Sequence, residues 1–365
     1  ASFTTHCIWN GFFAVLYTVL TTDKKGVAEE RRQIHNNIKR MELNKVHNIN
    51  FLNNTLPDKC ANLIIADPPY YQVKGDFDFI WKTFDDYLAD VEKWAIECKR
   101  LLADNGTMFW YGDDKNIAYS QIIIDKYFNL TNNLIWYKYN LRGGMFGSTG
   151  GDNVRSFPIC TERVLMYSND NGMTDINNDL DNYSDIRDYF NSERKKIGKS
   201  LTWINREVLG YSNGKDGMAG NILSVTKKGW SFPTKEQYNK LQKTGFFNKD
   251  YIIIRKRYEE YRDEYEEIRR PFSNTFNLNE VLQFNTNTQN EYEHDTVKPE
   301  KLTRALILTC SRQNDLVVVP FAGSGTECAM SAKEKRNCVG FEITKKHADM
   351  SNKRLKKIIS EPTMF

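Results

Sequence analysis

The sequence lacks the patterns typical of a metal site or a disulfide scaffold. Its seven cysteines form no Cys-x-x-Cys pair, and its five histidines show no metal-ligand spacing. Structural zinc sites and small disulfide-rich domains depend on such closely spaced pairs. We therefore expect buried, reduced thiols and no metal centre.

Long apolar runs are also missing. Residues 1–22 contain no Asp, Glu, Lys or Arg, but the apolar run at 8–20 is short for a membrane span and is broken by Asn10 and Gly11. It also lacks the basic start and the small-residue cleavage site of a secretion signal. We expect a soluble, cytoplasmic protein with no membrane partner.

The composition is that of a globular protein with a sizeable core. The chain has 365 residues, of which 27% are charged, 40% hydrophobic and 13% aromatic. Its charge is uneven, because residues 191–257 hold fifteen Lys and Arg against five Asp and Glu, a net charge of +10. This segment is either a solvated lysine-rich surface or a face that docks on phosphates.

Aromatic residues interleaved with these cations favour nucleic acid over a purely solvated face. They are Trp203, Tyr211, Trp230, Tyr238, Phe246 and Phe247.

Apolar periodicity predicts strands and helices that alternate along the chain. The strands are expected at 62–66, 107–111, 134–139, 163–167, 316–319 and 338–342, and the helices at 86–102, 117–127, 234–241, 251–270, 299–310, 323–334 and up to 359. A βαβαβ order predicts a parallel sheet with helices on both faces. Residues 141–290 depart from this texture, so we expect them to form an insert in the α/β fold.

The first motif with chemical content is Asp67-Pro68-Pro69-Tyr70, which follows the predicted strand 62–66. Ligands of open α/β sheets bind at the carboxyl ends of strands. The two prolines restrict the backbone, so that a carboxylate, a carbonyl and an aromatic ring can be presented together. Two acceptors and a ring suit an exocyclic amine on an aromatic base. The alternative is a surface turn with a packed tyrosine.

The second motif is the glycine loop Phe321-Ala322-Gly323-Ser324-Gly325-Thr326, between a predicted strand and helix. Glycines there let the backbone approach a ligand closely, and the helix N-terminus can hold a phosphate or a carboxylate. Glu342, at the end of the next strand, can accept hydrogen bonds from a ribose, or can serve as a structural cap. The loop does not match GxxxxGK[ST], which argues against a P-loop NTPase.

The two motifs, in this order and 254 residues apart, resemble the β-class amino-methyltransferases of DNA. The resemblance covers about residues 45–358. Further matching segments are Leu56-Pro57-Asp58, Arg269-Arg270-Pro271-Phe272 and His294-x-Thr296-x-Lys298-Pro299.

By this resemblance, residues of the first motif map onto the catalytic motif and those of the second onto the cofactor site. The implied catalytic residues are Asp67, Pro68, Pro69 and Tyr70; the implied cofactor-binding residues are Asp67, Lys298, Phe321, Ala322, Gly323, Ser324, Gly325, Thr326 and Glu342. Lys298 matches a position near the cofactor's carboxylate. The chain departs from the family pattern at Asn50, Asp295 and Val319, where relatives often carry Asp, Pro and Asp.

The resemblance implies a Rossmann-like α/β fold, with a mixed, mostly parallel sheet and an inserted target-recognition region. The expected organisation is an N-terminal extension, a catalytic half, the recognition insert, a cofactor-binding half and a tail, at residues 1–40, 41–140, 141–290, 291–358 and 359–365. Met41 is either the start of the natural domain or an ordinary internal methionine. Candidate base-reading residues in the insert are Arg142, Arg155, Arg206 and Asn213.

The implied activity is adenine-N6 methylation of a flipped-out base in double-stranded DNA, with S-adenosyl-L-methionine as cofactor. Asp at the start of the first motif favours adenine, because relatives that act on cytosine N4 more often begin with Ser. Cytosine-N4 methylation, RNA methylation and a catalytically idle DNA-binding subunit are the alternatives. A homodimer and a cognate restriction endonuclease are further partners that the resemblance suggests.

Overall fold

A computed structural model describes residues 42–73, 76–139, 157, 159–169, 183–212, 216–224, 229–286 and 297–360. The expected N-terminal extension lies outside these residues, as do Arg142, Arg155, Asn213 and Asp295. The chain divides into two compact units. Unit 1 comprises residues 1–172 and 270–365, and unit 2 comprises residues 173–269.

Unit 1 contains a mixed sheet in which, among the described residues, eight strands are ordered β1-β8-β7-β2-β3-β5-β4-β6. The strands are β1 (Lys45–His47), β2 (Ala61–Ala66), β3 (Leu102–Gly112), β4 (Asn129–Tyr137), β5 (Thr161–Ser168), β6 (Val281–Gln283), β7 (Leu316–Val319) and β8 (Asn337–Phe341). Only β5 runs against its neighbours β3 and β4, and every other pairing is parallel. The expected mixed, mostly parallel α/β sheet is confirmed.

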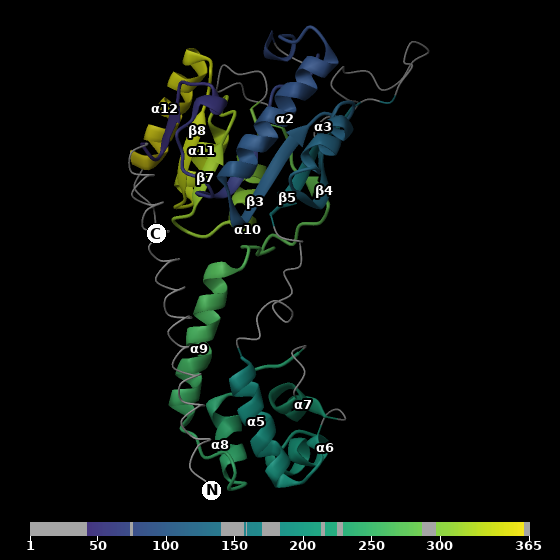
Figure 1. Ribbon diagram of the computed structural model, residues 1–365, viewed down its shortest axis with the longest axis vertical. Coiled ribbons are helices and arrows are strands. Elements are labelled where there is room, and N and C mark those ends of the chain that lie inside the picture. Colours follow the sequence, from purple (N-terminus) through teal and green to yellow (C-terminus); the bar gives the residue numbers. More distant parts are fainter. Residues whose placement is uncertain are drawn as a thin grey trace, which may run out of the picture. The chain divides into compact units, whose positions relative to one another are not determined.

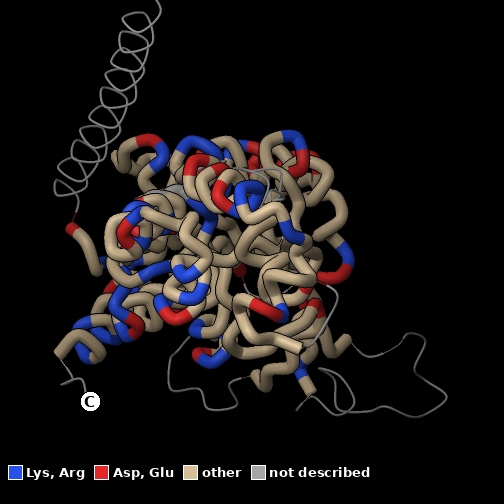
Figure 2. Tube along the Cα trace, turned by 90° about the horizontal axis from the view of Figure 1, so that it is seen from below, with Lys and Arg blue, Asp and Glu red and all other residues tan. Residues whose placement is uncertain are grey.

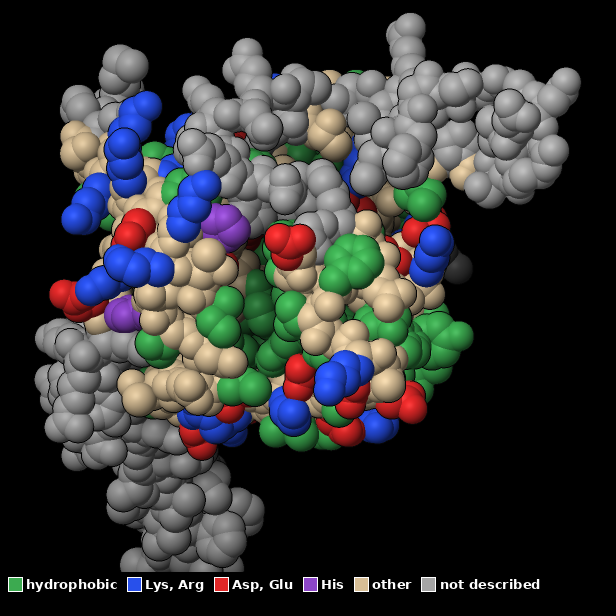
Figure 3. Space-filling view, turned by 90° about the horizontal axis from the view of Figure 1, so that it is seen from above, with side chains coloured by type: hydrophobic (Ala, Val, Ile, Leu, Met, Phe, Trp, Pro, Cys, Tyr) green, Lys and Arg blue, Asp and Glu red, His purple; other side chains and the backbone are tan. Residues whose placement is uncertain are grey.

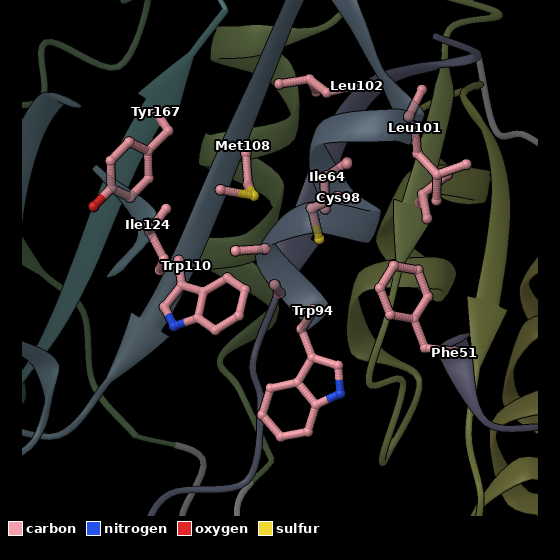
Figure 4. Close-up of a cluster of buried hydrophobic side chains, with 14 of the residues drawn as sticks. Phe51, Ile64, Trp94, Cys98, Leu101, Leu102, Met108, Trp110, Ile124 and Tyr167 are labelled. Atoms are coloured by element: carbon pink, nitrogen blue, oxygen red, sulfur yellow. The ribbon is translucent and has the colours of Figure 1, made fainter. Parts of the chain in front are cut away.

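Helices cover both faces of this sheet (Figure 1). On one face lie α2 (Phe84–Leu101) and α3 (Ile117–Ile124), and on the other lie α10 (Glu300–Cys310), α11 (Thr326–Lys333) and α12 (Lys345–Ser360). Successive side chains of a strand point to opposite faces. Ile64 and Ala66 therefore join the α2–α3 cluster, whereas Leu63 and Ile65 join the α10–α12 cluster. Figure 4 shows the first cluster, with Trp94 and Cys98 facing the strands.

The start of α2 shows how local sequence sets an element boundary. The Thr83 hydroxyl accepts a hydrogen bond from the Asp86 N–H, and the Asp86 carboxylate accepts one from the Thr83 N–H. This capping box satisfies two donors that the helix end would otherwise leave unpaired. It places the helix start at Phe84, two residues before the expected one. The three-residue edge strands β1 and β6 are too short for a periodic pattern, and the sequence did not predict them.

Unit 2 is helical and has its own core. Its helices are α5 (Ser184–Ile197), α6 (Leu201–Trp203) continuing into a π-helical turn (Ile204–Val208), α7 (Gly217–Leu223), α8 (Lys235–Gln242) and α9 (Tyr251–Ile268). The core is rich in aromatic side chains, with Phe190, Tyr238 and Phe247 almost fully buried. Unit 2 is narrower than the expected insert at 141–290, because β5 and β6 belong to the sheet of unit 1.

The aromatic residues of the basic segment serve this core more than the surface. Tyr238 and Phe247 are buried, and Trp230 packs against the same cluster. The expectation that the six aromatics favour a nucleic-acid face is therefore wrong for the buried ones. Trp203 and Tyr211 remain exposed.

In the described part of the chain, no helix has both the length and the apolar character needed to cross a bilayer. Of the six described cysteines, all are free thiols and five are buried; Cys160 is partly exposed.

Candidate active site

The two motifs lie at the ends of neighbouring parallel strands. Strands β2 and β7 pair with Leu63 opposite Val317 and Ile64 opposite Val318. Continued to the strand ends, this register brings Asp67 level with Phe321. From this pair the chain crosses to β3 on one side and to β8 on the other, which makes it the topological switch point of the sheet. Seen from above, this end of the molecule is hollowed near its centre, and hydrophobic side chains line the hollow (Figure 3).

Asp67 lies at the centre of a buried polar cluster. Its Oδ1 accepts a hydrogen bond from the Tyr70 hydroxyl at 2.8 Å, and its Oδ2 lies 2.7 Å from the ammonium nitrogen of Lys298. The Lys298 side chain is only 6% exposed. A buried ammonium requires an anionic partner, and here that partner is the carboxylate of the first motif.

Two further charges extend this cluster. Lys298 Nζ lies 3.5 Å from Oε2 of Glu162, and Lys138 Nζ donates to Oε1 of Glu162 at 2.5 Å. The Lys298 ammonium also lies 5.0 Å from the ring centroid of Tyr111, within cation–π range. The sequence analysis did not single out Glu162, Lys138 or Tyr111.

Burial and neighbouring charges change the pKa values in this cluster. Burial raises the pKa of Asp67, and the nearby Glu162 carboxylate adds to this effect, against the opposing influence of Lys298. For Glu162, burial also disfavours the charged form, but Lys298 and Lys138 outweigh it and lower the pKa. For Lys298, the two carboxylates outweigh burial and raise the pKa. Burial and Asp67 raise the pKa of Tyr70.

The turn at Pro68-Pro69-Tyr70 is supported by Asp78, a residue eight positions further along the chain. The Tyr70 N–H donates to Asp78 Oδ1 at 2.6 Å, and the Gln72 N–H donates to the Asp78 carbonyl at 2.8 Å. Asp78 is 2% exposed, so these bonds form away from water. This anchor fixes the backbone that presents Tyr70.

The glycine loop takes a backbone conformation that favours glycine. Gly323 has φ of 46° and Gly325 has φ of 73°. A Cβ added at Gly325 would lie 2.7 Å from the Cβ of Ser351 on α12, so the loop and this helix are in close contact. Ser351 also donates its hydroxyl to the Gly323 carbonyl at 2.7 Å.

Arg354 secures the remainder of the loop from α12. It is 5% exposed, and its Nη1 donates to the Thr326 hydroxyl at 2.8 Å and to the Ser324 carbonyl at 3.2 Å. Its Nη2 donates to Glu300 at the start of α10. One buried guanidinium therefore joins the loop to two helices. Sequence patterns did not indicate this residue.

Glu342 lies beside the same loop. Its Oε2 accepts from the Gly323 N–H at 2.9 Å, and its Oε1 accepts from the Thr344 N–H at 2.8 Å. The carboxylate therefore has the capping role that was the alternative. Each carboxylate oxygen can accept more than one hydrogen bond, so this role leaves acceptor capacity for a ligand hydroxyl.

The other named positions have structural roles. Phe321 packs edge-on against Trp94, with ring centroids 4.9 Å apart, and Ala322 is buried. Val319 is buried in the α10–α12 cluster, where an ionised Asp would lack water. Asn50 accepts a hydrogen bond from the Leu52 N–H at the start of a short helix.

The doubly wound sheet, with two motifs meeting at its switch point, defines a Rossmann-like α/β protein with a candidate ligand site between β2 and β7. The chain belongs to the N6/N4 DNA methylase family, because the family model, described as DNA methylase, matches residues 61–353.

Curated relatives of known name align over most of the chain. A DNA adenine methyltransferase, YhdJ of Escherichia coli K12, is 25% identical over 305 residues, which are 82% of this chain and 78% of that protein. The type II methyltransferase M.HinfI of Haemophilus influenzae is also 25% identical, over 84% of this chain and 66% of its own length. A solved structure of a DNA modification methylase from Thermus thermophilus, complexed with S-adenosyl-L-methionine, covers 84% of this chain and 91% of its own at 16% identity and a TM-score of 0.42.

We predict that Gly325→Ala lowers the free energy of unfolding by about 3 kcal/mol, because it adds both left-handed backbone strain and a clash with Ser351. Urea unfolding measures the loss. In the double variant with Ser351→Gly, the loss should be smaller than the sum of the two single losses, since the second change removes the clashing Cβ. Additive losses would contradict the proposed contact.

Glu327, in the first turn of α11, provides a pH-dependent prediction. Burial, with the charge of Asp67, raises its pKa from 4.5 to about 7, and within the described residues no hydrogen bond reaches its Oε1. The folded protein therefore holds this proton more tightly than the unfolded chain, and stability falls as pH rises through that window. Glu327→Gln should stabilise the protein at pH 8 by at most roughly 3 kcal/mol, and hardly at pH 4. Urea unfolding at both pH values checks this; an equal effect at both would contradict it.

Proposed function

We propose that the protein transfers a methyl group from S-adenosyl-L-methionine to N6 of a flipped-out adenine in double-stranded DNA. The observation that carries this proposal is the juxtaposition of the Asp67–Tyr70 turn and the glycine loop on the adjacent parallel strands β2 and β7. A methyl donor and an acceptor amine need to meet at one place, and two ligand-binding turns side by side provide it. Membership of the DNA methylase family supports the class of reaction.

The residues of the loop fit the proposed cofactor. The backbone at Gly323 and Gly325 has no side chain to obstruct a ligand, and Glu342 offers carboxylate oxygens beside it. We propose Phe321, Ala322, Gly323, Ser324, Gly325 and Thr326 as the cradle, Glu342 as the acceptor for ribose hydroxyls and Lys298 as the cation nearest the cofactor's carboxylate. When bound, S-adenosylmethionine supplies a methyl group on a positively charged sulfonium.

Asp67 and Pro68 are the proposed catalytic acceptors. The lone pair of adenine N6 is delocalised into the ring, so the amine is a weak nucleophile. Hydrogen bonds from its two N–H groups to the Asp67 carboxylate and the Pro68 carbonyl favour a pyramidal nitrogen with its lone pair directed outward. The new N–C bond forms as the methyl–sulfur bond breaks, and N6 then loses a proton, for which Asp67 is the nearest acceptor. The work is positioning and electrostatic complementarity.

Tyr70 is proposed to hold the flipped base. Extracting a base from the duplex costs a few kcal/mol, and stacking on an aromatic ring returns about 1–3 kcal/mol. The Asp67–Tyr70 hydrogen bond and the Asp78 anchor fix the ring near the catalytic carboxylate. Pro69 keeps the intervening backbone rigid.

Unit 2 is proposed to dock on the phosphates of DNA. Over residues 173–269 it has eighteen Lys and Arg against sixteen Asp and Glu, so acidic flanks nearly balance the basic segment 191–257. Figure 2 accordingly shows cations and anions interspersed along the trace. Exposed lysines such as Lys195, Lys199 and Lys243 are the best candidates for phosphate contacts. Arg206, a candidate base reader, forms an ion pair with its neighbour Glu207.

Cytosine-N4 methylation is the second candidate, since its target is also an exocyclic amine. Asp at position 67 and the adenine-specific relative YhdJ favour adenine. Sequencing of host DNA for modified bases after expression, compared with DNA from cells without the gene, identifies the base and its sequence context together. N4-methylcytosine in place of N6-methyladenine would overturn the adenine assignment.

Asp67→Asn should reduce methyl transfer about 100-fold or more, because it removes the charged acceptor of the amine, while leaving DNA binding intact. Transfer of labelled methyl groups measures the first effect and fluorescence anisotropy the second. Asp104→Asn, at an exposed residue paired with Lys59, is the matched control and should behave as wild type. Undiminished methylation by Asp67→Asn would refute the catalytic assignment.

Binding of duplex DNA should weaken steeply as salt increases. Changing Lys195, Lys199 and Lys243 to Gln should reduce the slope of log K against log salt by up to about 0.9 for each lost phosphate contact. The control triple variant, with Lys353, Lys356 and Lys357 on α12 changed to Gln, has the same net charge. Equal slopes for the two triple variants would place the phosphate contacts elsewhere than unit 2.

A further inference from the structure

Glu162 is a buried carboxylate that the packing of β5 does not require. The strand continues into Val164, Leu165 and Met166, which fill the two apolar clusters of the sheet. Because β5 is antiparallel, its first residues lie at the edge where the parallel strands end. The side chain of Glu162 is 18% exposed and faces two lysines instead of water.

Four charges form a chain in this edge of the sheet. In order they are Asp67, Lys298, Glu162 and Lys138, with contacts of 2.7, 3.5 and 2.5 Å between successive partners. The two carboxylates and two ammonium groups balance one another. Such a balance is what allows four charges to be buried together, because an unpaired one would carry a large desolvation cost.

We propose that Glu162 and Lys138 are positioning residues, which seat the Lys298 ammonium beside Asp67 and thereby set how strongly Asp67 accepts the hydrogen bond of the substrate amine. This inference rests on the proposed function, in which Asp67 is the acceptor.

The geometry gives Lys298 two anionic neighbours at unequal distances. A carboxylate held by a single, undivided ammonium would be a weaker acceptor for a substrate N–H. Glu162 shares the positive charge, and Lys138 in turn keeps Glu162 ionised and in place. Asp67 is thus kept as a paired anion that retains acceptor capacity.

Other groups also face Asp67 and remain unchanged in the test. Tyr70 donates its hydroxyl to the carboxylate, the ring of Tyr111 lies against Lys298, and Glu327 contributes from α11. Tyr70 and Tyr111 stay protonated well above neutral pH. Glu327 titrates near pH 7, so the pH profiles are also recorded in a Glu327→Gln background.

The test compares two single variants whose effects on Asp67 have opposite signs. Glu162→Gln removes a neighbouring negative charge, so Asp67 should ionise more readily and the acid limb of the kcat profile should move down by about one pH unit. Lys138→Met leaves the Glu162 charge uncompensated, so the same limb should move up by about as much. At the pH optimum, both should reduce kcat about tenfold.

Glu334→Gln is the matched control, because Glu334 is 16% exposed and pairs with Arg304 away from the site. Its acid limb should stay with that of wild type. Circular dichroism and thermal melting check folding, and the double variant Lys138→Met with Glu162→Gln, which preserves charge balance, replaces a single variant that fails to fold. In that double variant the limb should lie closer to wild type than in either single variant.

The pH dependence of S-adenosylmethionine affinity, measured by calorimetry, provides a readout that does not depend on turnover. Opposite shifts of the two single variants in this readout support the inference even if the wild type methylates no DNA, a result that would overturn only the proposed function. Unchanged limbs, or shifts of both variants in the same direction, would overturn the positioning role.

Discussion

The contact between the Asp67 carboxylate and the Lys298 ammonium is the constraint around which the site is built. Neither charge could be buried without the other, and their partners come from distant parts of the chain. Strand β2 supplies Asp67, the segment before α10 supplies Lys298, and β5 supplies Glu162. The contact therefore exists only when the first and last thirds of unit 1 form one sheet. Folding and the assembly of the site are the same event.

The arrangement of the sheet explains how a long insert is accommodated. The chain leaves the sheet after β5 and returns as β6, which pairs with the edge of β4. Strands β2 and β7, which hold the two motifs, are remote from that edge in the strand order. Unit 2 builds an aromatic core of its own, and so depends on the sheet for neither its apolar contacts nor its caps. The insert can thus differ in charge and content without disturbing the switch point.

Features that arise from short stretches of chain could be predicted from the sequence. The alternation of strands and helices, the Asp67–Tyr70 turn and the glycine loop are local, because periodicity, proline and glycine act on neighbouring residues. Residues whose role depends on remote partners were missed. Arg354 and Asp78 are ordinary charged residues in the sequence, and only their burial against the loop and the turn reveals their roles. Tyr238 and Phe247 were misread because an aromatic residue among lysines looks the same whether it faces a core or a ligand.

The sequence by itself determined the α/β class, the order of the two motifs and the family to which they point, since each of these follows from residue types at short spacing. Only the tertiary structure decided that β5 runs antiparallel and so carries Glu162 to the carboxyl edge. It also decided that Lys298 contacts Asp67 and that Glu342 caps the glycine loop. These outcomes depend on strand direction and on which buried charges find partners, and both are settled by packing over the whole sheet rather than by any local pattern.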